Sequence, residues 1–197
     1  MNAWELPTSL EVGGKEYPIR TDFRAVLDIL IAIGDPELFE PDSSEEEKNA
    51  IILSVVLEIL YVDMPPAEHI EEAYKKACEF IDAGMETEDK TKPIKMMDWQ
   101  QDAGVLIPAV NRVAGKEIRS MEYLHWWTFL GYYMEIGESL FSEILNIRDK
   151  KAHGKKLEKW EREFYSKNKG MIDFKNNGAV HLTDKEKDEV RKLFGLK

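Results

Sequence analysis

The order of apolar and polar residues along the chain predicts a mainly α-helical protein, a helical bundle with a short N-terminal β-hairpin. Residues 10–19 form the predicted hairpin, in which Gly13 and Gly14 supply the positive φ angles of a tight two-residue turn. Pro18 cannot donate a ladder hydrogen bond, so the second strand is expected at an edge. After the hairpin, apolar residues recur every three or four positions, the spacing of one helix face.

Characteristic residues mark where the first helices begin and end. Thr21 or Asp22 can cap the first helix, and Ser44 with Glu47 has the capping-box spacing that begins the second. Pro108 lies inside the fourth helix and predicts a kink or a break there. The apolar stripes of these four helices fall within residues 21–34, 44–61, 70–81 and 98–113.

Residues 121–150 are apolar around most of a helix circumference, with one narrow polar stripe. A continuous helix of this length would span about 45 Å, more than a small domain needs. We therefore expect either a bend at Gly131 or Gly137, or a helix that extends beyond its own core. A second amphipathic helix follows His153 and Gly154. Its apolar residues are Leu157, Trp160, Phe164 and Tyr165.

Length and these elements predict one helical domain over residues 1–170, which includes the hairpin and a polar loop at 84–97. Residues 171–197 are predicted to form a C-terminal tail with a short helix that begins at Thr183. The single cysteine, Cys78, excludes an intramolecular disulfide and fits a reducing cytoplasm. The most apolar window contains His125, Glu135 and Glu138, so we expect no membrane span.

Charge is distributed unevenly along the chain. Residues 148–169 hold nine Lys or Arg and four Asp or Glu, a net charge of +5, while residues 170–197 carry +1. Because the total is −11, residues 1–147 must carry −17. An acidic body repels nucleic acid over most of its surface. The pattern favours self-association through complementary charges, or docking on a partner of matching charge.

No residue pattern points to a reaction. The chain has no GxSxG, Walker or GxGxxG sequence, and its four histidines lack the spacing of a metal site. Asp98 and Asp102 are one turn apart, which favours a helix cap and a first-turn dipole partner over acid–base catalysis. We therefore expect a protein that is not an enzyme, with no cofactor, no metal and no small-molecule substrate.

The basic helix after Gly154 is the candidate partner-binding segment. Nucleic-acid binding through residues 148–169 remains an alternative, although acidic residues interrupt the basic ones and few aromatics could stack on bases. A helix that docks on another protein is favoured. The residues predicted to contact the partner are Trp160, Phe164, Lys155, Lys156 and Lys159.

Several stretches resemble a family of long-tailed bacteriophage and prophage proteins encoded in the tail gene cluster near the tape-measure protein. The resemblance covers the chain from about Leu6 to Asp173, and nothing from Lys175 onward matches. It is most specific in the aromatic and basic segments. The matching stretches are Leu6–Pro7, Tyr17–Ile19, Thr21–Arg24, Asp98–Asp102, Leu124–Phe129, Ile147–Lys151 and Lys155–Trp160.

The resemblance implies a non-enzymatic tail-assembly protein in the host bacterial cytoplasm. Members of this family are regarded as similar to tail-assembly chaperones, which coat the tape-measure protein until tail-tube subunits replace them. The expected partner is therefore the tape-measure protein, together with self-association. One alternative function, also in the phage tail, is that of a structural tail or virion component. A further alternative is a nucleic-acid-binding regulator.

Overall fold

The computed structural model describes residues 4–84 and 94–175 and confirms a mainly α-helical fold with a short antiparallel hairpin. In the hairpin, β1 (Ser9–Val12) pairs with β2 (Lys15–Pro18). Gly13 and Gly14 form the turn with φ angles of 57° and 74°, which residues with a side chain adopt rarely. The prediction of a Gly-Gly turn is therefore confirmed.

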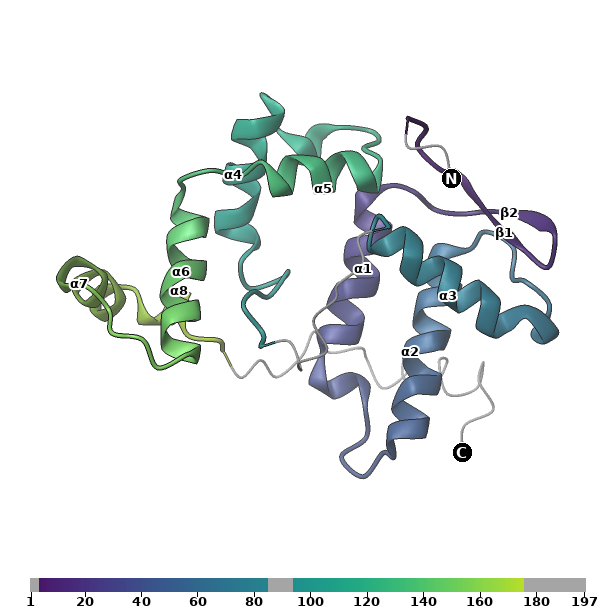
Figure 1. The fold of residues 1–197 in the computed structure, drawn as a ribbon, viewed down its shortest axis with the longest axis horizontal. Helices are drawn as coiled ribbons and strands as arrows, with labels where there is room; N and C mark the ends of the chain where they lie inside the picture. The colour runs from purple at the N-terminus through teal and green to yellow at the C-terminus, as the bar shows by residue number, and fades with distance from the viewer. Residues whose placement is uncertain (1–3, 85–93, 176–197) are drawn as a thin grey trace.

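Helices make up most of the remaining described chain (Figure 1). The α1–α2 pair and α3 lie toward the hairpin, α5 lies between α4 and the start of α1, and α4 and α6 connect this part to α7 and α8. Short 3-10 turns occur at η1 (Pro36–Leu38), η2 (Ala67–His69) and η3 (Ile118–Ser120). The α-helices are α1 (Phe23–Gly34), α2 (Glu45–Leu60), α3 (Ile70–Ile81), α4 (Ala103–Ala114), α5 (Trp126–Met134), α6 (Leu140–Ala152), α7 (Lys159–Lys167) and α8 (Lys169–Ile172).

The first helices begin at caps that the sequence predicts. Asp22 is the N-cap of α1 and accepts a hydrogen bond from the Arg24 N–H at 3.0 Å. Thr21, the other candidate, instead shares a hydrogen bond of 2.7 Å with the Tyr123 hydroxyl. Ser44 and Glu47 form the expected capping box at the start of α2. Local side-chain chemistry therefore determines where these helices start.

The sequence left open whether residues 121–150 bend at Gly131 or Gly137 or form one long helix, and the structure divides this stretch into α5 and α6. Residues before α5 are held extended against the start of α1, where the Phe23 N–H donates to the Leu124 carbonyl and the Trp126 N–H donates to the Thr21 carbonyl. Ser139 then begins α6 with a second capping box. Of the two glycines considered for a bend, Gly137 lies in the interruption and Gly131 lies within α5.

Two further predictions differ from the structure or lie outside it. Of the kink or break predicted at Pro108, the break does not occur, since α4 runs from Ala103 to Ala114 with Pro108 inside it. The predicted C-terminal helix beginning at Thr183 lies outside the described residues, as does most of the polar loop. The four-residue α8 follows α7 directly and has no counterpart in the sequence prediction.

Buried apolar side chains form two clusters. The main core draws on both strands, on α1 to α5, on η3 and on the first turn of α6, and Trp126, Phe129, Phe80 and Leu60 are among its fully buried members. A minor core lies beneath α7 and α8. Ile144, Ile147 and Ile172 are its buried residues, and Leu157, Phe164 and Tyr165 pack against them.

Candidate partner-binding surface

The region that carries the predicted site is a helical arm, which we define as α6, α7 and α8. In Figure 1 the arm occupies the end of the molecule opposite the hairpin, and α7 is its outermost helix. The minor core holds α7 and α8 against α6 with few apolar residues. Polar contacts must therefore contribute much of the stability of this small unit.

A buried carboxylate fixes α7 on α6. The Glu161 side chain is 1% exposed and accepts hydrogen bonds from Lys150 Nζ at 2.5 Å and Asn146 Nδ2 at 2.9 Å. It also accepts the Glu158 N–H, which closes the capping box at the start of α7. Burial alone would raise the pKa of the Glu161 carboxyl, but the hydrogen bonds from Lys150 and Glu158 outweigh burial and lower this pKa below its ordinary value of 4.5.

The lowered pKa predicts that acid weakens the arm. The Glu161 carboxylate takes up a proton less readily in the folded state than in the unfolded state. Its contribution to the free energy of unfolding is therefore complete above about pH 4.5, and it is lost as the pH falls through the lowered pKa of the folded state. We expect Glu161→Gln to reduce the fall in unfolding free energy between neutral and acidic pH. Urea unfolding at several pH values measures this fall. Glu163→Gln, at an exposed position of the same helix, is the matched control. An unchanged pH dependence in the Glu161→Gln variant would contradict the assignment.

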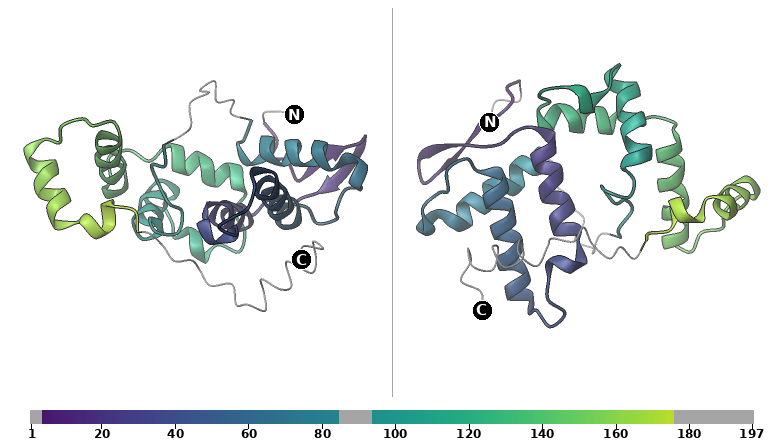
Figure 2. Two further views of the ribbon diagram at one scale, coloured as in Figure 1. Left: turned by 90° about the horizontal axis from the view of Figure 1, so that it is seen from below. Right: turned by 180° about the vertical axis from the view of Figure 1, so that it is seen from behind.

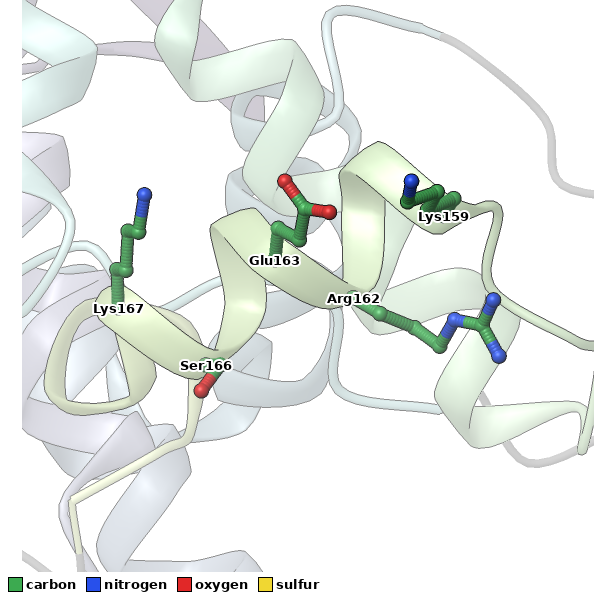
Figure 3. A pocket seen from close by; sticks show the side chains of 5 residues that line it. All are labelled: Lys159, Arg162, Glu163, Ser166 and Lys167. Carbon is green, nitrogen blue, oxygen red and sulfur yellow. The ribbon is translucent and has the colours of Figure 1, made fainter.

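The face of α7 opposite Glu161 is polar and mostly basic. Figure 3 shows Lys159, Arg162, Glu163, Ser166 and Lys167 around one shallow hollow. Their spacing of three and four residues places them on a single helix face, which we call the basic face. Within residues 4–84 and 94–175, its three cations form no ion pair. The basic face is thus open to a partner that carries negative charge.

The structure separates the five residues predicted to contact a partner. Trp160 is 52% exposed beside the basic face, and Lys156 and Lys159 are exposed as well. Phe164 is half-buried against the minor core, and Lys155 lies 3.1 Å from the Asp149 carboxylate. Trp160, Lys156 and Lys159 therefore remain the stronger candidates for partner contact, while Phe164 and Lys155 also stabilise the arm.

Internal ion pairs use much of the positive charge of residues 148–169. Of the nine Lys and Arg residues there, four contact carboxylates of the same chain. These four are Arg148, Lys150, Lys151 and Lys155. This arrangement leaves fewer cations to follow a phosphate backbone than the sequence count indicates, which favours a protein partner over nucleic acid.

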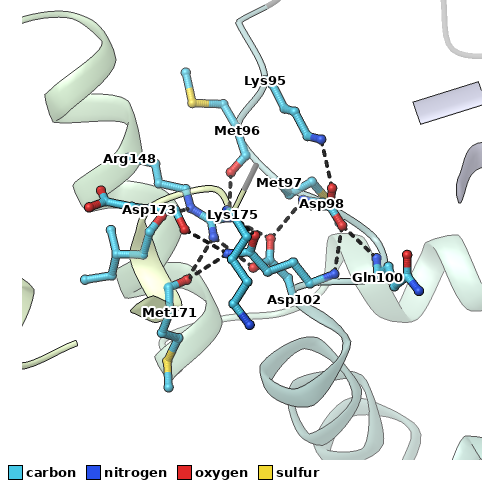
Figure 4. A network of polar contacts seen from close by, with 12 residues as sticks. Lys95, Met96, Met97, Asp98, Gln100, Asp102, Arg148, Met171, Asp173 and Lys175 are labelled. Carbon is cyan, nitrogen blue, oxygen red and sulfur yellow. Dashed lines mark hydrogen bonds and ion pairs between the residues drawn. The ribbon is translucent and has the colours of Figure 1, made fainter. Parts of the chain in front are cut away.

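A buried polar network, which sequence reasoning missed, joins the arm to the rest of the fold (Figure 4). The Arg148 guanidinium donates to both carboxylate oxygens of Asp102 at 2.6 and 2.8 Å, and the two side chains are 4% and 1% exposed. Arg148 also donates to the carbonyls of Met96, Met171 and Ile172. The prediction that Asp102 is a first-turn dipole partner is therefore wrong, because it is the buried partner of Arg148.

Two neighbours of Asp102 complete this network. Asp98 accepts hydrogen bonds from the Gln100 and Gln101 N–H groups and so caps the turn before α4 instead of α4 itself. The Gln101 side chain donates to the Asp173 carbonyl and accepts the Lys175 N–H. The Asp98–Asp102 and Ile147–Lys151 stretches meet here, which gives both a structural role. The sequence offered only an Asp and an Arg as signs of this network, in segments otherwise consistent with surface positions.

The aromatic stretch at the start of α5 is also structural. The indole N–H groups of Trp126 and Trp127 donate to the carbonyls of Ile81 and Phe80, each at 2.8 Å, at the end of α3. His125 accepts the Trp127 N–H on Nδ1, so its Nε2 carries the proton donated to the Pro7 carbonyl. The two indoles thus bond to carbonyls at the end of α3, and His125 caps the start of α5.

Among residues 4–84 and 94–175, no group of three or more His, Cys, Asp or Glu side chains is placed to hold a metal ion. No described helix has the length and apolar character needed to cross a membrane.

Comparison with known proteins gives one match. The family model described as Bacteriophage Gp15 protein matches residues 3–174, which include the hairpin, the main core and the whole arm. No curated protein and no solved structure matches the chain. The phage origin implied by the sequence resemblance is thus confirmed, and the matched region ends where the Arg148 network closes. The chain belongs to the bacteriophage Gp15 family.

Proposed function

We propose that this protein is a non-enzymatic phage assembly protein that acts in tail morphogenesis as a chaperone of the tape-measure protein. Membership of a bacteriophage family supports a role in building phage structure. The observation that carries the proposal is the exposed Trp160 beside unpaired cations on a firmly anchored helix. An aromatic anchor with a charged surround is typical of a protein-binding site.

The partner best suited to this surface is an amphipathic helix with acidic residues. Trp160 offers apolar area, and Lys156, Lys159 and Arg162 favour carboxylates next to it. A tape-measure protein, as a long helical chain that must stay soluble before the tube assembles, could present such segments in the host cytoplasm. The arm would cover them until tube subunits take their place.

Coexpression with the tape-measure protein tests this proposal. We expect the complex to co-purify and the soluble yield of the tape-measure protein to rise. Trp160→Ala combined with Lys159→Glu should reduce the retained tape-measure protein at least about tenfold, which corresponds to about 1.4 kcal/mol. Met64→Ala with Lys75→Glu is the matched control, since Met64 is 50% exposed and both positions lie outside the arm.

Two results would contradict the chaperone role. The first is equal solubility of the tape-measure protein with and without this chain, with no complex recovered. The second is a fixed number of copies of this chain in purified virions, which would favour the structural tail component instead. Retention on duplex DNA that falls steeply with salt would favour the nucleic-acid-binding alternative.

A further inference from the structure

The turn between α1 and α2 is strongly acidic. Residues 35–47, which we call the acidic turn, contain seven Asp or Glu and no Lys or Arg. Asp35 and Glu47 serve as helix caps, whereas Asp42, Glu45 and Glu46 are exposed, with Glu45 paired to Lys48 at 3.3 Å. This segment therefore presents a concentrated negative charge at the end of the α1–α2 pair.

Apolar side chains beside the acidic turn lack a full packing partner. Ile31, Ile51 and Val55 are half-buried, and within the described chain none of them belongs to the main core or packs against it. They lie on α1 and α2, next to the acidic turn in sequence. An apolar strip bordered by carboxylates matches the composition of the basic face, where Trp160 is bordered by cations.

These two complementary surfaces lie far apart in one molecule. Figure 1 shows α7 at one end and the acidic turn beneath α1 and α2, with α4 and α6 between them. The rear view in Figure 2 shows the same separation. The arm is anchored by the Arg148–Asp102 pair, so α7 cannot reach the acidic turn of its own chain without breaking that network. A contact between the two surfaces requires two molecules.

We propose that the basic face and Trp160 of one copy dock on the acidic turn and the adjoining apolar strip of a second copy. Lys159, Arg162 and Lys167 then face Asp42, Glu45 and Glu46. The two surfaces differ, so a pair of copies joined by this contact leaves one basic face and one acidic turn unoccupied. Repetition of such a contact produces a ring or an open chain of copies.

Exposed ion pairs are individually weak and are screened by salt. The association is therefore reversible and strongest at low ionic strength. It goes beyond the proposed function, because it needs no other phage protein. At any one arm, a second copy and a tape-measure segment exclude each other, so binding of the tape-measure protein would release copies from the assembly.

Light scattering on the purified chain tests the docking. At low salt the average mass should rise with protein concentration, and high salt should return it to the monomer. Lys159→Glu with Lys167→Glu should abolish the rise, as should Asp42→Lys with Glu46→Lys. The capping box at Glu47 is unchanged in both variants. The matched controls change exposed residues of the same charge elsewhere: Lys75→Glu with Lys116→Glu, and Glu71→Lys with Glu122→Lys.

Mixing the two defective variants distinguishes this geometry from a symmetric dimer. The variant with Lys159→Glu and Lys167→Glu (the arm variant) keeps its acidic turn, and the variant with Asp42→Lys and Glu46→Lys (the turn variant) keeps its basic face. Their mixture should therefore form a 1:1 complex and no larger assembly. A variant with all four substitutions has an acidic α7 face and a basic turn, so its copies should associate with one another again. Circular dichroism confirms folding, and alanine replaces any charge-reversing change that unfolds the chain. A monomeric parent at low salt, a turn variant that still associates, or a mixture that stays monomeric would overturn the proposal.

Discussion

Replacing Arg148 with methionine is expected to lower the free energy of unfolding by about 3–5 kcal/mol, the usual cost of leaving one member of a buried ion pair without its partner. Asp102, which is 1% exposed, would lose its ion-pair partner, and the carbonyls of Met171 and Ile172 would lose a donor. Urea unfolding followed by circular dichroism measures the loss. Hydrogen exchange at α7 and α8 shows whether the arm detaches before the rest unfolds.

A second change separates the unpaired charge from the lost packing. Asp102→Asn removes the charge but keeps an oxygen that can accept the Asp98 N–H. Asp102→Asn should therefore restore part of the stability that Arg148→Met removes. In the unchanged protein, the same substitution should lower the free energy of unfolding. Arg112→Met, at an exposed position of α4, is the control and should change stability by no more than about 0.5 kcal/mol. Additive losses in the double variant would contradict the buried-pair interpretation.

Replacing Trp126 with alanine is also expected to cost about 3–5 kcal/mol, the range for removing a large aromatic side chain from a core. Trp126 is 1% exposed, stacks on Phe129 with ring centroids 5.5 Å apart, and donates its indole N–H to Ile81. The cavity would lie between α3 and α5, where these contacts join the helices. Chemical denaturation of the folded variant gives the free energy directly.

Two other variants show which part of Trp126 matters. Trp126→Phe fills most of the space but leaves the Ile81 carbonyl without its donor, so a loss of about 1–3 kcal/mol is expected. Trp160→Ala should change stability by less than about 1 kcal/mol, because that side chain is 52% exposed. Equal losses at positions 126 and 160 would mean that Trp160 is structural, and the candidate surface would lose its anchor.

The sequence predicts helices well where the signals are local. The Asp22 cap, the capping box of Ser44 and Glu47, and the Gly13-Gly14 turn each depend on residues only a few positions apart. For the same reason, the basic helix after Gly154 and its Trp160 could be predicted as an exposed element. Its anchor at Glu161 could not, since the partners Asn146 and Lys150 belong to another helix.

By itself, then, the sequence determined the helical class, the hairpin, most helix ends and the charge contrast between body and arm, because propensity, capping and net charge are properties of short segments. Tertiary structure decided that the residues just before α5 stay extended, since the Phe23 N–H donates to the Leu124 carbonyl and the Trp126 N–H donates to the Thr21 carbonyl. It alone paired Asp102 with Arg148, 46 positions apart. It also decided which cations stay unpaired on α7, because an ion pair depends on distance in space and on burial, and spacing along the chain specifies neither.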